Sequence, residues 1–167
     1  CGELASSGIM GANRLASNSL IECLVFGKRA VEDSVRNRRE DPIPETIPSF
    51  SLDREKLDAY LSLKNKVADI MTQEAGIIRT ENGLQEGLEN LLRLEQTEIF
   101  EENEYYSLVS KNLLTVAELI IRSALFRKES RGGHFRSDYP TPNDDYVCHI
   151  IQQKGKEIKT TPVILNN

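Results

Sequence analysis

The sequence predicts a mainly helical protein built around an antiparallel three-helix bundle. Apolar residues recur at helical spacing from residue 53 to about residue 131, in three successive stretches of about 20 residues. Only short segments join these stretches, and short joints make consecutive helices antiparallel neighbours. We therefore expect residues 53–145 to form the bundle domain.

Residues 1–40 precede the bundle and are expected to form a loop followed by one helix. Residues 1–15 are rich in Gly, Ala and Ser and show no period. The helix is predicted from about Ser19, because Ser19 and Glu22 have capping-box spacing, and it should end in the charged run over residues 36–40. One face of this helix is apolar: Leu20, Leu24, Ala30, Val31 and Val35.

Residues 41–52 are predicted to be a stiff, extended linker. Pro42, Pro44 and Pro48 lie there among polar residues. Each proline removes a backbone donor and restricts the residue before it, so this stretch suits a domain boundary.

The first two bundle helices follow the linker. The first is predicted over residues 53–73, with Gly76 as a stop signal. The second is amphipathic, although Gly83 and Gly87 lower its helix propensity near the start. Its apolar face is expected to contain Leu84, Leu88, Leu91 or Leu92, and Ile99.

The third bundle helix is predicted from Tyr105 to Lys128, before Gly132 and Gly133 end the helical pattern. Its residues are apolar almost all round, which predicts burial on more than one side. The tail over residues 146–167 has weak strand character around Gly155, which indicates a possible short hairpin.

Composition narrows the class of function. The chain has 167 residues, is 39% hydrophobic and 28% charged, and carries a net charge of −5. These values suit a soluble globular protein and argue against a general nucleic-acid or membrane-surface role. No apolar run is long enough to span a bilayer. The three cysteines have no CxxC spacing, so we expect no metal site and a reducing, cytoplasmic setting.

Residues 11–20 read GANRLASNSL and form the strongest candidate binding segment. Small and polar residues lead directly into the predicted helix. A helix N-terminus offers unpaired N–H groups and a positive dipole end, which suit an anion or an electron-rich ring. Arg14 adds a planar guanidinium that matches a carboxylate. The segment therefore predicts a site for a negatively charged ligand.

Three ordered segments resemble one known family. Cys1-Gly2-Glu3 with residues 11–30 (GANRLASNSLIECLVFGKRA) resembles the closing segment of the flavin domain in the L-aspartate oxidase family, which belongs with the succinate dehydrogenase and fumarate reductase flavoproteins. Residues 75–80 (AGIIRT) and 127–140 (RKESRGGHFRSDYP) resemble two later segments of that family. Succinate dehydrogenases more typically read GANRLGANSLLD at the first segment, so LASNSLIE favours aspartate oxidase.

The resemblance implies an enzyme that uses FAD and oxidises L-aspartate to iminoaspartate by hydride transfer to the flavin. This reaction leads to quinolinate and NAD, with oxygen or fumarate as electron acceptor and quinolinate synthase as downstream partner. The family also has a GxGxxG fingerprint and a capping domain, which these 167 residues do not contain. The chain therefore resembles the C-terminal third of the enzyme, with residues 1–40 as the end of the FAD-binding domain. Alone it is expected to be inactive.

The same resemblance implies roles for four residues. Glu3 is expected to hold hydroxyl groups of FAD, and Ser19 and Leu20 to lie at the pyrimidine edge of the flavin. Arg14 is expected to bind a substrate carboxylate. The resemblance assigns no catalytic proton donor and no metal ligand to this chain.

Met10 and His134 have no such role. Met10 stands where aspartate oxidases commonly have His, and a thioether cannot replace an imidazole as a donor. His134 lies directly after two glycines, and we interpret it as a structural residue rather than a catalytic one.

Two alternatives remain open. The chain could belong to a succinate dehydrogenase or fumarate reductase type of enzyme, since both chemistries need a carboxylate clamp such as Arg14. The isolated bundle could also be a non-catalytic helical interaction module.

Overall fold

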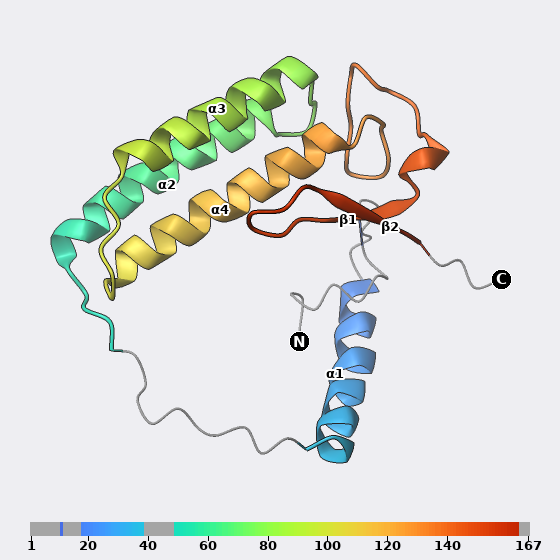
Figure 1. Cartoon of the computed structure of the whole chain (residues 1–167), viewed down its shortest axis with the longest axis horizontal. Helices are drawn as coiled ribbons and strands as arrows, with labels where there is room; N and C mark the ends of the chain where they lie inside the picture. Colours follow the sequence, from blue (N-terminus) through green and yellow to red (C-terminus); the bar gives the residue numbers. More distant parts are fainter. Residues whose placement is uncertain (1–10, 12–17, 39–48, 164–167) are drawn as a thin grey trace. The chain divides into compact units, whose positions relative to one another are not determined.

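The computed structural model describes residues 11, 18–38 and 49–163, in two compact units (Figure 1). The first unit comprises residues 1–47 and 131–133, and the second comprises residues 48–130 and 134–167. One unit contains helix α1, and the other contains the bundle and the C-terminal hairpin. No helix within the described ranges is both long and apolar enough to cross a membrane.

Helix α1 covers Asn18–Arg36, close to the predicted range. Ser19 lies inside its first turn, so the prediction that Ser19 caps the helix is wrong by at least one residue. The predicted apolar face is present on α1 and strongly exposed within its own unit: Leu20, Leu24, Val31 and Val35 are all at least 65% exposed.

Three helices form the bundle, as the sequence predicts: α2 (Arg54–Glu74), α3 (Glu81–Thr97) and α4 (Tyr105–Phe126). Each begins at a side-chain cap. Asp53 accepts a hydrogen bond from the amide of Glu55, Thr80 from that of Gly83, and Glu104 from that of Ser107. Each helix packs on both others, and α3 runs antiparallel to α2 and α4 (Figure 1). The mainly helical class and the bundle are confirmed.

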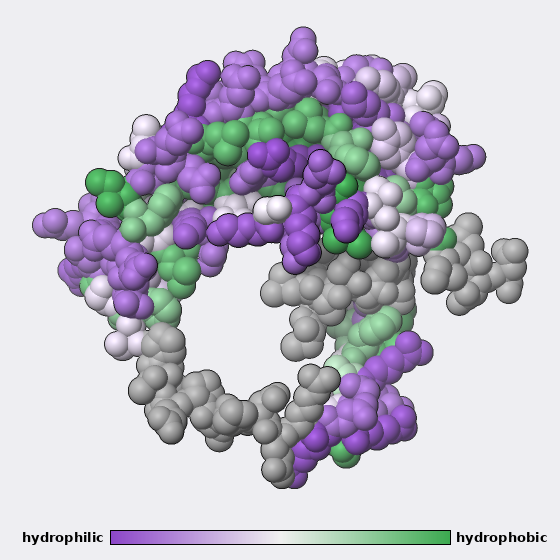
Figure 2. Space-filling model, in the orientation of Figure 1, coloured by the Kyte–Doolittle hydropathy of each residue, from purple (hydrophilic) through white to green (hydrophobic). Residues whose placement is uncertain are grey.

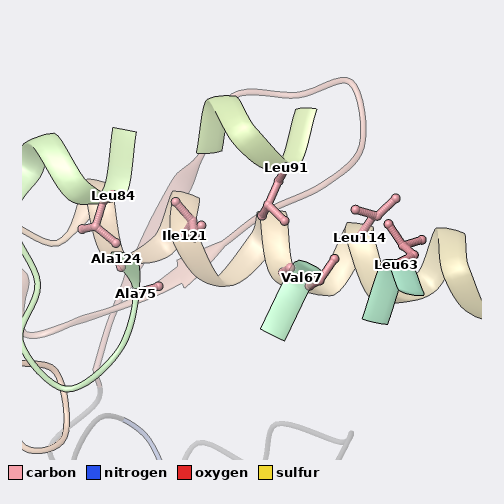
Figure 3. Packing of buried hydrophobic residues seen from close by; sticks show 9 residues of the cluster. Leu63, Val67, Ala75, Leu84, Leu91, Leu114, Ile121 and Ala124 are labelled. Carbon is pink, nitrogen blue, oxygen red and sulfur yellow. The ribbon is translucent and has the colours of Figure 1, made fainter. Parts of the chain in front are cut away.

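The core lies along the line where the three helices meet. Nine buried apolar residues point toward one another (Figure 3). Eight lie in the three helices, and Ala75 directly follows α2. They are Leu63, Val67, Ala75, Leu84, Leu91, Leu114, Ala117, Ile121 and Ala124. Hydrophilic residues cover the outer side of the bundle, and a band of apolar surface remains between them (Figure 2).

Two predictions about the core need correction. Ile99 is not part of the α3 apolar face: α3 ends at Thr97, and Ile99 is 84% exposed in the following segment. The helix stops there because Glu98 adopts an extended backbone. Helix α4 is buried on one side only within its unit, since Val116, Leu119 and Ile120 are at least 40% exposed.

The C-terminal segment belongs to the same unit as the bundle. Strand β1 (Cys148–Ile151) pairs antiparallel with β2 (Lys159–Pro162), around the turn at Gly155. The end of the predicted linker also joins this unit: the amide of Ser51 donates to Asn103 O at 3.0 Å, and that of Tyr105 donates to Ser51 O at 3.1 Å.

Gly87 shows why α3 contains a glycine that lowers its helix propensity. A Cβ atom at this buried position would lie 2.9 Å from Cβ of Glu74 and 3.2 Å from Cδ1 of Ile121. The glycine therefore lets α3 approach α2 and α4 closely. Gly83 differs, because the atoms nearest to such a Cβ are the carboxylate end of the Glu74 side chain, at 2.9 Å, and Oγ1 of Thr80, at 3.2 Å.

We expect Gly87→Ala to destabilise the bundle and Gly83→Ala to leave it unchanged or more stable. Both variants gain about 1 kcal/mol of helix propensity. Only Gly87→Ala overpacks the core, at a cost of about 1–3 kcal/mol. Urea unfolding of both variants checks this, and equal midpoints would show that the α3 contact tolerates a methyl group.

Candidate functional site

The sequence places its candidate site around the start of α1, and the structure describes part of it. Ser19 and Leu20 lie in the first turn of α1, with Ser19 half-buried and Leu20 67% exposed. Glu3, Met10 and Arg14 lie outside the described residues. The roles of Glu3, Arg14, Ser19 and Leu20 therefore stay predictions.

The first turn of α1 fits one requirement of a flavin. Ser19 and Leu20 are among the first residues of the helix, whose N–H groups have no partner within the helix. No acidic side chain lies in this first turn, at the positive end of the helix dipole. Such a turn can stabilise negative charge on a bound ring.

A cluster of charged residues lies at one end of the bundle, where α3 begins and α4 ends. We call it the ion-pair cluster, and it joins the two later segments that the sequence singled out. Its members are Arg79, Glu81, Arg127, Glu129, His134, Arg136 and Asp138.

Arg136 is the centre of the ion-pair cluster and is fully buried. Its Nη2 donates to Glu81 Oε2 at 2.8 Å and to Asp138 Oδ2 at 2.7 Å, and its Nε donates to Asp138 Oδ1 at 2.8 Å. Its Nη1 donates to Ala124 O at 3.0 Å, near the end of α4. One guanidinium thus ties α3, α4 and its own loop together.

The charges of this group match the two helix ends. Arg136 is cationic at the C-terminal end of α4, where carbonyl groups point outward. Asp138 accepts a hydrogen bond from the amide of Glu81, at the N-terminal end of α3, at 2.8 Å. The hydrogen bonds that the Arg136 guanidinium donates to Asp138 hold the pKa of this carboxyl group well below its usual range.

His134 connects Arg79 to the end of α4. Nη1 of Arg79 donates to Nδ1 of His134 at 2.9 Å, and Nε2 of His134 donates to Arg127 O at 3.0 Å. The backbones also pair, since the amide of Arg79 donates to Phe135 O and that of Ser137 to Arg79 O. His134 is 7% exposed and both ring nitrogens form hydrogen bonds, which supports its structural interpretation.

Arg127 anchors the C-terminal hairpin to the bundle. Its guanidinium donates to Glu129 Oε1 at 2.5 Å, to Tyr146 O at 2.6 Å and to Cys148 O at 2.9 Å. Glu129 is fully buried and also accepts the amide of Asn143 at 2.8 Å. The predicted tail is therefore held by side chains of the α4 end.

The ion-pair cluster is suited to scaffolding rather than to chemistry. Its guanidiniums and the imidazole bind other groups of the same cluster or backbone carbonyls. The segments AGIIRT and RGGHFRSDYP were already recognisable in the sequence as resembling the family. Spacing alone could not pair Arg79 with His134 or Glu81 with Arg136, because the members of each pair are 55 residues apart.

The opposite end of the bundle carries a groove of about 360 Å³. It lies between the first turns of α2 and α4, and Lys56, Tyr60 and Tyr106 contribute to its wall. Lys56 forms an ion pair with Glu101 beside it. In the described part of the chain, no three His, Cys, Asp or Glu side chains are grouped so that they could hold a metal ion.

Comparison with known proteins agrees with this architecture. The model of the family described as "Fumarate reductase flavoprotein C-term" matches residues 64–167, which include the second half of α2, both later helices and the hairpin. Among solved structures, the Sdh1 complex of Mycobacterium smegmatis in its apo form is similar, with a TM-score of 0.57 and 26% identity, over 90% of this chain and 30% of that one.

Curated relatives extend the similarity to the segment before the bundle. L-aspartate oxidase of Acinetobacter baylyi is 36% identical over 97% of this chain and 31% of its own length. L-aspartate oxidase of Pseudomonas aeruginosa is 38% identical over 83% of this chain and 27% of its own length. The chain thus spans about a third of these relatives. Because the family model matches more than half of the residues, the chain belongs to the C-terminal family of the fumarate reductase flavoproteins.

Proposed function

We propose that this chain is the C-terminal part of an FAD-dependent L-aspartate oxidase, which oxidises L-aspartate to iminoaspartate. The observation that carries the proposal is the identity of 36% to an L-aspartate oxidase over 97% of the chain, including α1 and the segment before it. That segment holds GANRLASNSL, which departs from the pattern typical of succinate dehydrogenases.

Three features of this chain serve the reaction. Arg14 binds a carboxylate of L-aspartate through two parallel hydrogen bonds and so orients the substrate. The amides of Ser19 and Leu20 stabilise negative charge at the pyrimidine edge of the cofactor, without reorganisation during the reaction. Glu3 accepts hydrogen bonds from hydroxyl groups of FAD. FAD itself supplies the two-electron acceptor chemistry.

The proposal also includes the metabolic setting. Oxygen or fumarate takes the electrons from the reduced enzyme, and quinolinate synthase consumes the product on the route to NAD. The protein works in the cytoplasm. This setting is proposed from the resemblance of the three sequence segments to L-aspartate oxidases.

The experiment is anaerobic flavin reduction in the intact protein that carries these residues. We expect L-aspartate to bleach the flavin absorbance and succinate to leave it unchanged. When air is then admitted to the protein reduced by L-aspartate, the flavin should be reoxidised and oxygen reduced to hydrogen peroxide. Bleaching by succinate alone would instead favour a succinate dehydrogenase or fumarate reductase type of enzyme, which uses the same carboxylate clamp.

A titration of the isolated 167 residues with FAD helps to distinguish the enzyme from a third possibility, a non-catalytic interaction module. We expect no tight binding, because the chain contains no GxGxxG segment for the cofactor phosphates. Stoichiometric binding would show that these residues hold a complete flavin site. Absence of flavin in the intact protein as well would favour a non-catalytic interaction module.

A further inference from the structure

His134 is one of only two histidines in the chain and links two loops that are distant in sequence. It lies between Arg79, which follows α2, and Arg127, which ends α4. We propose that His134 is an acid-sensitive link: a neutral ring holds the loop at Arg79 against residues 134–138, and protonation of the ring releases that loop. This inference is independent of the proposed function.

The hydrogen-bond geometry determines the state of the ring. A guanidinium can only donate, so Nδ1 of His134 must accept from Nη1 of Arg79 through its lone pair. The proton is then on Nε2, which donates to Arg127 O at 3.0 Å. The structure therefore requires a neutral imidazole, and a proton added at Nδ1 removes the acceptor that Arg79 uses.

The charges around the ring oppose protonation. Arg79 faces it from the loop after α2, Arg127 from the end of α4, and Arg136 from its own segment. Their carboxylate partners, Glu129, Asp138 and Glu81, accept hydrogen bonds from Arg127 or Arg136. An imidazolium here would lie among three guanidiniums.

The direction of the pH effect follows from these contacts. Burial, together with the three arginines, lowers the pKa of His134 below its ordinary 6.5. Between the lowered pKa and 6.5, the open state binds more protons than the closed state, so acid favours opening. The link is fully formed above about pH 6.5 and is lost as the pH falls through the lowered pKa.

The test is hydrogen exchange of the full chain at a series of pH values, expressed as protection factors. The reporters are the amides of Arg79 and Ser137, which donate to Phe135 O and Arg79 O. Below about pH 6.5 we expect their protection to fall by up to about tenfold per pH unit, until the lowered pKa is reached. An amide in the middle of α4, such as that of Leu114, should stay protected.

Two matched variants separate His134 from general acid sensitivity. In His134→Gln the side-chain carbonyl can accept from Arg79 and the amide can donate to Arg127 O, but the group does not titrate. We expect this variant to keep protection at all these pH values. His149→Gln changes the exposed second histidine and should behave like the unmodified protein.

Three results would overturn the inference. The first is an equal loss of protection in His134→Gln and the unmodified protein. The second is a ring that carries its proton on Nδ1 at neutral pH, as read from the ¹⁵N chemical shifts of the unmodified protein. The third is protonation of the ring with unchanged protection at Arg79 and Ser137. The second and third readouts need no variant, so a variant that fails to fold does not block the test.

Discussion

Arg136→Met is expected to lower the free energy of unfolding of the bundle by about 3 kcal/mol. Removing one partner of a buried ion pair costs about 3–5 kcal/mol, because the opposite charges stay behind without compensation. The lower part of that range applies, since the side chains of Glu81 and Asp138 are 32% and 29% exposed and keep some hydration. Loss of the bond to Ala124 O contributes to the effect.

The matched control for Arg136→Met is Arg93→Met. Arg93 pairs with Glu89 on the surface of α3, where the two side chains are 72% and 68% exposed. Exposed pairs of this kind contribute at most about 1 kcal/mol. Urea unfolding of both variants measures the difference, and equal midpoints would mean that the buried cluster adds nothing beyond a surface pair.

Arg14→Met in the intact protein is expected to lower kcat/KM for L-aspartate by about 100- to 1,000-fold. This loss corresponds to about 3–4 kcal/mol, within the range for removing one partner of a buried, hydrogen-bonded charge pair. The flavin content should stay unchanged, because the proposed role of Arg14 concerns the substrate. Arg14→Lys keeps the charge but loses the planar fork, so it should recover only part of the activity.

The control for Arg14 is Arg29→Met. Arg29 is an exposed residue of α1 whose guanidinium lies 5.4 Å from the ring centroid of Phe26, so this variant makes the same chemical change elsewhere on the same segment. Steady-state kinetics with L-aspartate compare the two variants. Equal kcat/KM values for them would contradict a carboxylate clamp at Arg14.

Local patterns predicted the helices well because each pattern is complete within its own segment. Apolar spacing placed α2 and α4 within two residues of their observed ends. The same reasoning assigned Ile99 to α3, because periodicity does not reveal where the backbone leaves the helix. It also counted Gly87 as a weakness of α3, although the glycine allows close contact with Glu74 and Ile121.

The predicted site divides in a similar way. The order of motifs along the chain led to the family and to the roles proposed for Arg14 and the start of α1. Those roles are contacts with FAD or with the carboxylate of the substrate. The charged residues of RGGHFRSDYP remained without assigned partners, because a sequence of charges does not state which of them will be buried together.

By itself the sequence determined the helical class, the order of the helices and the family. Helical periodicity and short motifs depend only on residues that are close together along the chain. Only the tertiary structure decided that Arg136 binds Glu81 and that His134 binds Arg79. The members of each pair are 55 residues apart along the chain, and the packing of α2, α3 and α4 brings them together. The physical reason is burial: packing excludes water from these groups, and each charged or polar group must then find its partner inside the protein.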